Sequence, residues 1–156
     1  MNYIIREMKQ TERKLLKDFL YEAIFVPDGM EAPPKRIIEQ PKLQVYIANF
    51  GRKDDNCLVA EVRGVLVGAV WSRIMDDYGH VDDITPSLAI SIFKEFRGFG
   101  IGTVLMKGML TLLKNKGYKQ VSLSVQKANF AYKLYLQVGF YVLNETDDEY
   151  IMVCDL

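Results

Sequence analysis

Apolar residues recur along this chain with two periods, and these periods divide it into short strands and helices. The most distinct short apolar run lies at 87–92, which we predict to be a buried strand at the centre of a sheet. A glycine-rich turn follows, and then Ile101, Leu105, Met109 and Leu112 repeat at helical spacing. This repeat predicts a long amphipathic helix closed by Gly117, because glycine readily takes the left-handed conformation that ends helices.

The flanking segments carry weaker patterns of the same two kinds. Before the central strand we predict strand 3–8, helix 12–24 with Thr11 as its N-cap, and a Pro/Gly-rich loop at 25–34. One or two short helices then follow at 35–39 and 42–49, divided by Pro41. Strands 57–61 and 65–74 form a predicted hairpin around Arg63-Gly64. After the central helix we predict a half-buried strand at 120–125, helix 129–138, and strands 140–145 and 149–154.

This order of elements predicts one mixed sheet with helices packed on it, an α/β (α+β) fold. The strand–helix–strand unit over 87–125 should form a right-handed parallel crossover, which makes 87–92 and 120–125 a parallel pair. No linker or internal repeat divides the chain, so we expect a single domain over 1–156.

The turn between the central strand and helix has the properties of an anion site. The first turn of a helix has N–H groups without partners inside the helix and a partial positive charge of roughly half a unit. Gly98, Gly100 and Gly102 have no side chains to keep a phosphate from the backbone, and Arg97 adds a full charge beside them. We interpret this turn as a pyrophosphate cradle; the alternative is a turn that only joins strand to helix.

Two familiar phosphate motifs fail here. The dinucleotide fingerprint G-x-G-x-x-G has Thr103 where its third glycine should stand, and the next strand ends without an acid for a ribose. The P-loop also fails, because no lysine precedes Thr103. A nicotinamide oxidoreductase is therefore a weak interpretation.

Charge is unevenly distributed, although the formal net charge is zero and gives no reason to expect nucleic-acid binding. Between 94 and 133 the chain has eight basic residues against the single acid Glu95; the bases are Lys94, Arg97, Lys107, Lys114, Lys116, Lys119, Lys127 and Lys133. A basic segment around the proposed phosphate turn suits a polyanionic ligand, although many of these lysines should simply be solvated.

The remaining composition excludes several classes of protein. Cys57 and Cys154 both fall in predicted strands and look like small buried hydrophobes in a reducing compartment. His80 is the only histidine, so a multi-histidine metal site is excluded and we expect no metal. We see neither a signal peptide nor an apolar run long enough to span a membrane, and therefore expect a cytoplasmic protein that does not act at membranes.

Two motifs together resemble the GNAT N-acetyltransferase superfamily. The first is Arg97-Gly-Phe-Gly-Ile-Gly102 directly after a strand, which resembles the acyl-CoA turn of that family. The second is Asn129-Phe-Ala-Tyr-Lys-Leu-Tyr135-Leu-Gln-Val-Gly139-Phe140, which resembles the later Asn…Ala…Leu-Tyr-x-x-x-Gly-Phe segment. The resemblance covers the whole chain, most strongly 62–141. It implies a mostly antiparallel sheet flanked by helices, acetyl-CoA as cosubstrate and an amine as acceptor.

The resemblance also implies roles for particular residues. Ile90, Ser91 and Ile92 would bind the pantetheine arm through their backbone. The pyrophosphate would be held by the turn residues, namely Arg97, Gly98, Phe99, Gly100, Ile101, Gly102 and Thr103. Asn129 would bind near the pantetheine, although its step to Tyr135 is six residues where many members have seven. Tyr135 would stand by the sulfur and protonate the leaving thiolate, and Tyr132 is its substitute.

The acceptor side is less determined by the sequence. We expect a carboxylate in the acidic connector before the central strand to act as general base, with Asp83 first because it lies closest to that strand among Asp82, Asp83 and His80. Glu31 and Glu61 are further candidates. Residues 25–50 should form the acceptor wall through Phe25, Met30, Tyr46 and Phe50, or else cover the core.

Several alternatives stay open at this point. The acceptor is a small molecule or a peptide, and a protein N-terminus, a lysine, a polyamine, an aminoglycoside or a small metabolite all fit. An acyl-CoA-binding regulatory module without turnover needs the turn but neither Tyr135 nor an acid near Asp83. A homodimer that pairs through sheet edges or the last strands is the assembly we consider.

Overall fold

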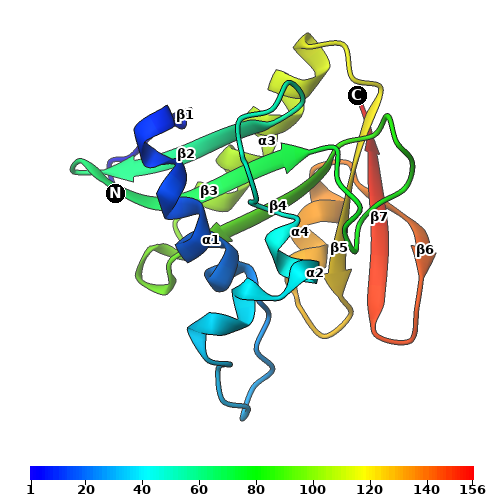
Figure 1. Ribbon diagram of the computed structural model, residues 1–156, viewed down its shortest axis with the longest axis horizontal. Helices are drawn as coiled ribbons and strands as arrows, with labels where there is room; N and C mark the ends of the chain where they lie inside the picture. The colour runs from blue at the N-terminus through cyan, green and yellow to red at the C-terminus, as the bar shows by residue number, and fades with distance from the viewer.

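One seven-stranded sheet forms the centre of the protein in a computed structural model that describes residues 1–156, with the strand order β1-β2-β3-β4-β5-β7-β6 (Figure 1). The strands are β1 Ile4–Glu7, β2 Asn56–Val62, β3 Val65–Arg73, β4 Ser87–Ile92, β5 Gln120–Gln126, β6 Tyr141–Glu145 and β7 Glu149–Asp155. Neighbouring strands are antiparallel except for the pair β4–β5, which is parallel. The predicted mixed sheet and its parallel pair are therefore confirmed.

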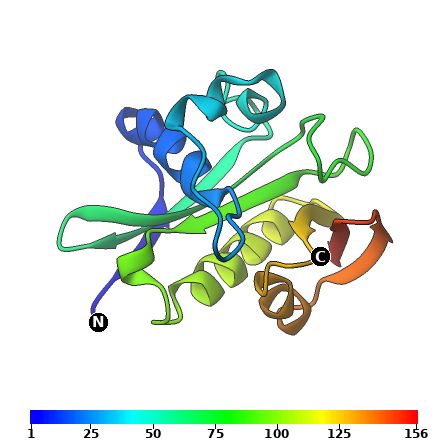
Figure 2. The same ribbon diagram turned by 90° about the horizontal axis from the view of Figure 1, so that it is seen from below.

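Helices cover both faces of this sheet. They are the 3₁₀ helices η1 Gln10–Leu15, η2 Lys35–Glu39 and η3 Lys94–Phe96, and the α-helices α1 Leu16–Ala23, α2 Pro41–Gln44, α3 Ile101–Asn115 and α4 Ala131–Gln137. Figure 2 shows α1 and the segment that leads to α2 on one face, and α3 and α4 on the other. None of the helices combines the length and the apolar character that a membrane span requires.

The sheet separates two hydrophobic cores, because successive side chains of a strand point to opposite faces. On the α3/α4 face, Leu88 packs with Ile101 and Leu105 of α3. On the α1/α2 face, Phe19 of α1 packs with Trp71 of β3. Side chains at even positions of β4 belong to the first core and those at odd positions lie on the α1/α2 face, so β4 connects the two halves of the protein.

Two predicted helix boundaries were wrong. Thr11 is not an N-cap, because the chain starts as 3₁₀ helix after Lys9, whose N–H donates to the Glu12 carboxylate at 2.8 Å. The division of this segment at Pro41 is confirmed, since η2 ends at Glu39 and Pro41 opens α2, where its missing N–H costs nothing. The α-helix beginning there stops at Gln44 rather than at residue 49.

Helix α3 follows its predicted face for three of the four expected positions. Ile101, Leu105 and Met109 are completely buried, but the next turn buries Leu113 instead of Leu112. The helical period is 3.6 residues, so a strict step of three or four drifts across the buried face over four turns. Gly117 closes the helix with φ +92°, as its position predicted.

The parallel strands β4 and β5 pair only where β4 begins. Their registered pair is Ser87 with Ser122, and the Ser122 N–H donates to the Pro86 carbonyl at 3.0 Å. Beyond this point β4 stays paired with β3 alone. The side of β4 that faces β5 therefore has backbone groups outside the ladder from about Ala89 onward, which is the feature that positions the candidate site.

Candidate functional site

The turn after β4 presents an uninterrupted row of main-chain donors. The N–H groups from Gly98 to Thr103 donate to no backbone or side-chain acceptor, and the first bond of α3 runs from the Val104 N–H to the Gly100 carbonyl at 3.2 Å. The first turn of this 15-residue helix contains no acidic side chain that would offset its positive end. Such a helix start is a ready anion site.

The three glycines of the turn have different physical roles. Gly98 and Gly100 have φ of +83° and +81°, so the left-handed conformation itself selects glycine, and a Cβ at either position would meet nothing within 4 Å. A Cβ on Gly102 would stand 3.2 Å from the Ile92 side chain. Gly102 thus lets α3 approach β4 closely.

Arg97 connects the turn to both neighbouring elements. Its Nε donates to the Ile92 carbonyl at 2.8 Å, and its Nη2 pairs with the Glu22 carboxylate of α1 at 2.9 Å. The guanidinium is half exposed and has five N–H donors, so these two bonds leave others available. Arg97 therefore fixes the end of β4 against α1 as well as adding charge beside the turn.

The backbone of β4 alternates between two directions. The Phe93 N–H donates to the Val67 carbonyl of β3 at 2.9 Å, and the register places Ser91 opposite Ala69 in the same phase. By the alternation of an antiparallel ladder, the main-chain groups of Ile90 and Ile92 point away from β3, toward the side where β5 has separated. Of the predicted pantetheine contacts, Ile90 and Ile92 thus have backbone groups available, whereas those of Ser91 belong to the ladder.

Ser91 has a structural role that the motif did not reveal. Its side chain is buried on the α1/α2 face, and its hydroxyl donates to the Phe19 carbonyl at 2.7 Å. This bond ties the middle of α1 to the central strand.

Replacing Ser91 by Ala is expected to lower the free energy of unfolding by about 1 kcal/mol, because it removes a buried hydrogen bond between β4 and α1. Coenzyme A affinity should change less than about twofold, since the backbone is unaltered. Urea unfolding and calorimetric titration measure the two quantities. Thr111→Ala on the exposed side of α3 is the control and should cost less than about 0.5 kcal/mol.

The second motif folds into α4 and its two ends. Asn129 opens the helix, because its Oδ1 accepts from the Ala131 N–H at 3.0 Å while its Nδ2 has no partner within the protein. Gly139 closes it with φ +113°, and the Phe140 N–H then donates to the Tyr135 carbonyl at 2.9 Å. This closure places the Phe140 ring 6.0 Å from the Tyr135 ring. The spacing Tyr-x-x-x-Gly-Phe therefore brings two aromatic rings together, and the Phe140 ring packs against Tyr135.

Tyr135 has a buried ring and an unpartnered hydroxyl. The residue is 8% exposed and packs in the α3/α4 core together with Ile90 and Ile92 of β4. Its hydroxyl makes no hydrogen bond within the protein, yet it is not sealed from solvent. Burial raises the pKa of Tyr135 to about 12, so the hydroxyl keeps its proton throughout the neutral range. Tyr132, the substitute, instead packs against Tyr150.

Asp83, the first candidate for the general base, points into solvent. Its side chain is 99% exposed and approaches only the His80 ring, with 3.4 Å between Oδ1 and Nε2. Glu61 is paired with Arg6 at 2.9 Å and so links β2 to β1, while Glu31 lies exposed in the loop after α1. Although Asp83 is the acid of the connector closest in sequence to β4, its side chain is directed into solvent.

Asp77 in the same connector is turned inward, a placement that the sequence analysis did not single out. Its Oδ1 accepts from the hydroxyl of Ser87, the first residue of β4, at 2.7 Å. The Tyr46 hydroxyl lies beside it, and burial raises the pKa of the Asp77 carboxyl. The sequence signal was the run Asp76-Asp77 among four acids in the connector, and nothing local distinguishes the one that the loop turns inward.

The loop that carries Asp77 is packed directly on β5. The Ser122 hydroxyl donates to the Gly79 carbonyl at 2.7 Å, and a Cβ on Gly79 would stand 3.0 Å from backbone atoms of Leu123 and Ser124. Glycine is required at 79 because no side chain fits between the loop and the strand. This cover also explains why Ser122 is completely buried, where the alternating pattern predicted a half-buried strand.

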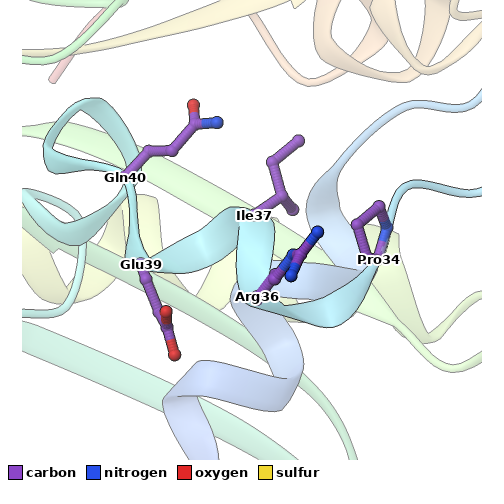
Figure 3. A pocket seen from close by; sticks show the side chains of 5 residues that line it. All are labelled: Pro34, Arg36, Ile37, Glu39 and Gln40. Carbon is purple, nitrogen blue, oxygen red and sulfur yellow. The ribbon is translucent and has the colours of Figure 1, made fainter.

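The predicted acceptor wall divides into two parts. Tyr46 is buried and Phe50 half-buried in the α1/α2 core, whereas Phe25 is half-buried and Met30 is 67% exposed in the loop after α1. A hollow of about 520 Å³ lies on this segment and is lined by Pro34, Arg36, Ile37, Glu39 and Gln40. Figure 3 shows Glu39 pointing away from Ile37 and Gln40, so no set of polar groups converges in it.

No three His, Cys, Asp or Glu side chains gather closely enough to hold a metal ion. Cys57 and Cys154 are both buried free thiols.

A sequence model described as the acetyltransferase (GNAT) family matches residues 18–140 of the chain. The sequence matches none of the curated proteins. Many solved structures share the fold.

One such structure is PaiA N-acetyltransferase from Thermoplasma acidophilum in complex with coenzyme A, which is 18% identical over 100% of both chains with a TM-score of 0.71. Another is the ribosomal-protein-S18-alanine N-acetyltransferase from Escherichia coli, 15% identical over 99% of this chain and 94% of that one, with a TM-score of 0.70. The structure of yncA from Salmonella typhimurium with its cofactor acetyl-CoA is 15% identical over 100% and 95%, with a TM-score of 0.69. At these identities the likeness shows a shared fold and nothing more.

Proposed function

The chain belongs to the acetyltransferase (GNAT) family, and on this premise we propose that it transfers the acetyl group of acetyl-CoA to a primary amine, which attacks the thioester directly. The observation that carries the proposal is the row of main-chain N–H groups from Gly98 to Thr103 at the start of α3. A diphosphate bound there would place the rest of the cosubstrate along β4, where the backbone is no longer paired with β5.

Each part of the candidate site has a role in this proposal. The N–H groups of the turn hold the pyrophosphate, with the charge of Arg97 beside them. The backbone groups of Ile90 and the N–H of Ile92, which point away from β3, bind the pantetheine arm, while the Ile92 carbonyl stays bonded to Arg97. The free Nδ2 of Asn129 adds a donor at the start of α4. These contacts need no change in the backbone, because the groups are already outside the ladder.

The chemistry requires a stabilised oxyanion and a proton for the leaving thiolate. A main-chain N–H near Ile92 supplies a fixed dipole for the oxyanion at no cost of reorganisation. Tyr135 supplies the proton, because its pKa of about 12 keeps the hydroxyl protonated and its lack of a protein partner leaves it free to donate.

Incubation of the protein with acetyl-CoA and a panel of primary amines, followed by measurement of free thiol, tests the proposed function. We expect amine-dependent thiol release above the hydrolysis of acetyl-CoA alone. Coenzyme A binding without turnover on any amine would instead favour an acyl-CoA-binding regulatory module, and coenzyme A failing to bind would remove both functions.

We place the reaction in a reducing compartment, the cytoplasm, since both cysteines are free thiols. The domain spans 1–156 and acts on a small-molecule or peptide amine. Pairing of two copies through β6 is the assembly we consider, because this edge strand is exposed along its whole length. Light scattering on the purified protein measures the oligomeric state, and a monomer would contradict this pairing.

A further inference from the structure

Asp77 is a half-buried carboxylate without a cation. It takes part in no ion pair, and the groups that face it are the Ser87 hydroxyl of β4, the Tyr46 hydroxyl and the Gly79 N–H of its own loop. His80 of the same loop is directed instead to the Met75 carbonyl and to Asp83. A carboxylate withdrawn from water without a positive partner is costly, and a bound cation would offset that cost.

Several contacts fix the position of this carboxylate. Its loop is held to β5 through Ser122 and Gly79, and to β4 through Ser87. Tyr46 is fixed from the other side, because the Trp71 Nε1 donates to its carbonyl at 3.0 Å. The Tyr46 hydroxyl faces both Asp77 and Ser124 of β5. Asp77 is thus held by packed elements, although it lies in a connector.

The cluster of Asp77, Tyr46 and Ser87 lies on one face of the sheet and Tyr135 on the other, both near the place where β4 and β5 separate. Tyr46 belongs to the core on the α1/α2 face, and the Ser87 side chain, at an odd position of β4, points to that same face. Tyr135 belongs to the core on the α3/α4 face. Ser87 forms the last registered pair between β4 and β5, so the cluster stands at the closed end of the separation. An acceptor reaching this point approaches from the α1/α2 face.

We propose that Asp77, flanked by Tyr46 and Ser87, binds the ammonium group of the acceptor and takes its first proton, which makes the substrate a primary amine without a carboxylate on the carbon that bears the nitrogen. This inference rests on the proposed function. The exclusion follows from charge, because no basic side chain faces Asp77 to receive a second carboxylate, and two carboxylates held close together repel each other.

The proton balance is complete with these groups. The ammonium gives one proton to Asp77, and the neutral nitrogen forms the bond to the acetyl carbon as the carbon–sulfur bond breaks. The thiolate takes the proton of Tyr135, and the second proton of the nitrogen leaves through water and restores that tyrosine. Asp77 then returns its proton to solvent, so the net products are the amide, free thiol and one proton.

The test uses matched probes that differ only in the carboxylate: tyramine and tyrosine, agmatine and arginine, histamine and histidine. With the wild-type protein we expect thiol release from the amine of at least one pair and a kcat/KM at least about 50-fold lower for its amino acid. Asp77→Asn should lower kcat/KM for that amine about 100-fold. It should also remove the fall in kcat/KM that the wild-type protein shows as the pH is lowered and Asp77 becomes protonated. Asp83→Asn, in the same loop, should stay within about twofold of wild type.

Three further measurements separate the ways of failing. Coenzyme A affinity must be unchanged in Asp77→Asn, which shows that the variant is folded, and Tyr46→Phe must raise KM with less effect on kcat. If the wild-type protein binds coenzyme A but turns over no amine, the proposed function fails, and calorimetry of amine binding to the coenzyme A complex then decides on Asp77. Binding or turnover that is the same in Asp77→Asn as in wild type overturns the inference, as does the absence of both for all three amines.

Discussion

Replacing Tyr135 by Phe is expected to lower kcat about 10²- to 10³-fold while leaving coenzyme A affinity and the fold unchanged. The Tyr135 hydroxyl is the proposed proton donor to the leaving thiolate, and general acid catalysis typically contributes a factor of this size. The ring stays packed against Phe140, and removing the hydroxyl leaves no protein group without its hydrogen-bond partner. The free energy of unfolding should therefore change by less than about 1 kcal/mol. Steady-state thiol release and urea unfolding measure the two effects.

The pH profile gives an independent check on this role. Because burial raises the pKa of Tyr135 to about 12, its ionisation should not lower kcat of the wild-type protein between pH 7 and about pH 10. Tyr132→Phe is the matched control and should keep kcat within about twofold, since that ring packs on Tyr150. If Tyr135→Phe retained kcat while Tyr132→Phe lost it, the acid would be Tyr132.

Replacing Thr103 by Glu is expected to weaken coenzyme A binding about 100-fold and, at the same time, to leave the fold as stable or slightly more stable. Thr103 is the third residue of α3, where a carboxylate near the helix N-terminus contributes about 0.3–1 kcal/mol of stability. The same carboxylate would stand among the N–H groups proposed to hold the diphosphate, and like charges at roughly 5 Å repel by about 3 kcal/mol at an effective dielectric constant near 20. Binding and stability thus move in opposite directions.

Calorimetric titration with coenzyme A and urea unfolding of the same preparation provide the test. Thr103→Gln keeps the length of the side chain without the charge, and its affinity should fall less than about fivefold. Equal losses in the two variants would point to a steric effect, and unchanged affinity in Thr103→Glu would place the diphosphate away from this helix.

Elements with a strong local signal were predictable from sequence. The turn at Arg63-Gly64 is an example, because both residues have positive φ, of 51° and 80°, and the hairpin pattern around them is unambiguous. The unit from β4 to α3 was similarly clear, since one apolar run, one glycine turn and one helical repeat follow in order. Predictions failed where the signal was weak, as at η1, whose start depends on Glu12 being shared between the Lys9 N–H and the Arg6 guanidinium.

The candidate site shows the same division between near and distant contacts. The family motifs indicated the turn at Gly98–Thr103 and the helix of Tyr135, because those functions depend on backbone conformation and on spacing within one element. They did not distinguish Gly102, which packs against Ile92, from the two glycines that the left-handed conformation selects. Nor did they show that the Ser91 side chain is used by α1.

The sequence by itself indicated the family, the glycine turn that opens α3 and the aromatic pair that fixes Tyr135. Each of these depends on neighbouring residues and needs only local backbone geometry. The tertiary structure alone decided which acid of the connector turns inward. Nothing in the local sequence distinguishes Asp77 from Asp83. They differ in the structure because Gly79 lies against β5 and because the Ser87 hydroxyl donates a hydrogen bond to the Asp77 carboxylate. Burial and charge partners are properties of the packed chain, so the inward placement of Asp77 could be seen only in the tertiary structure.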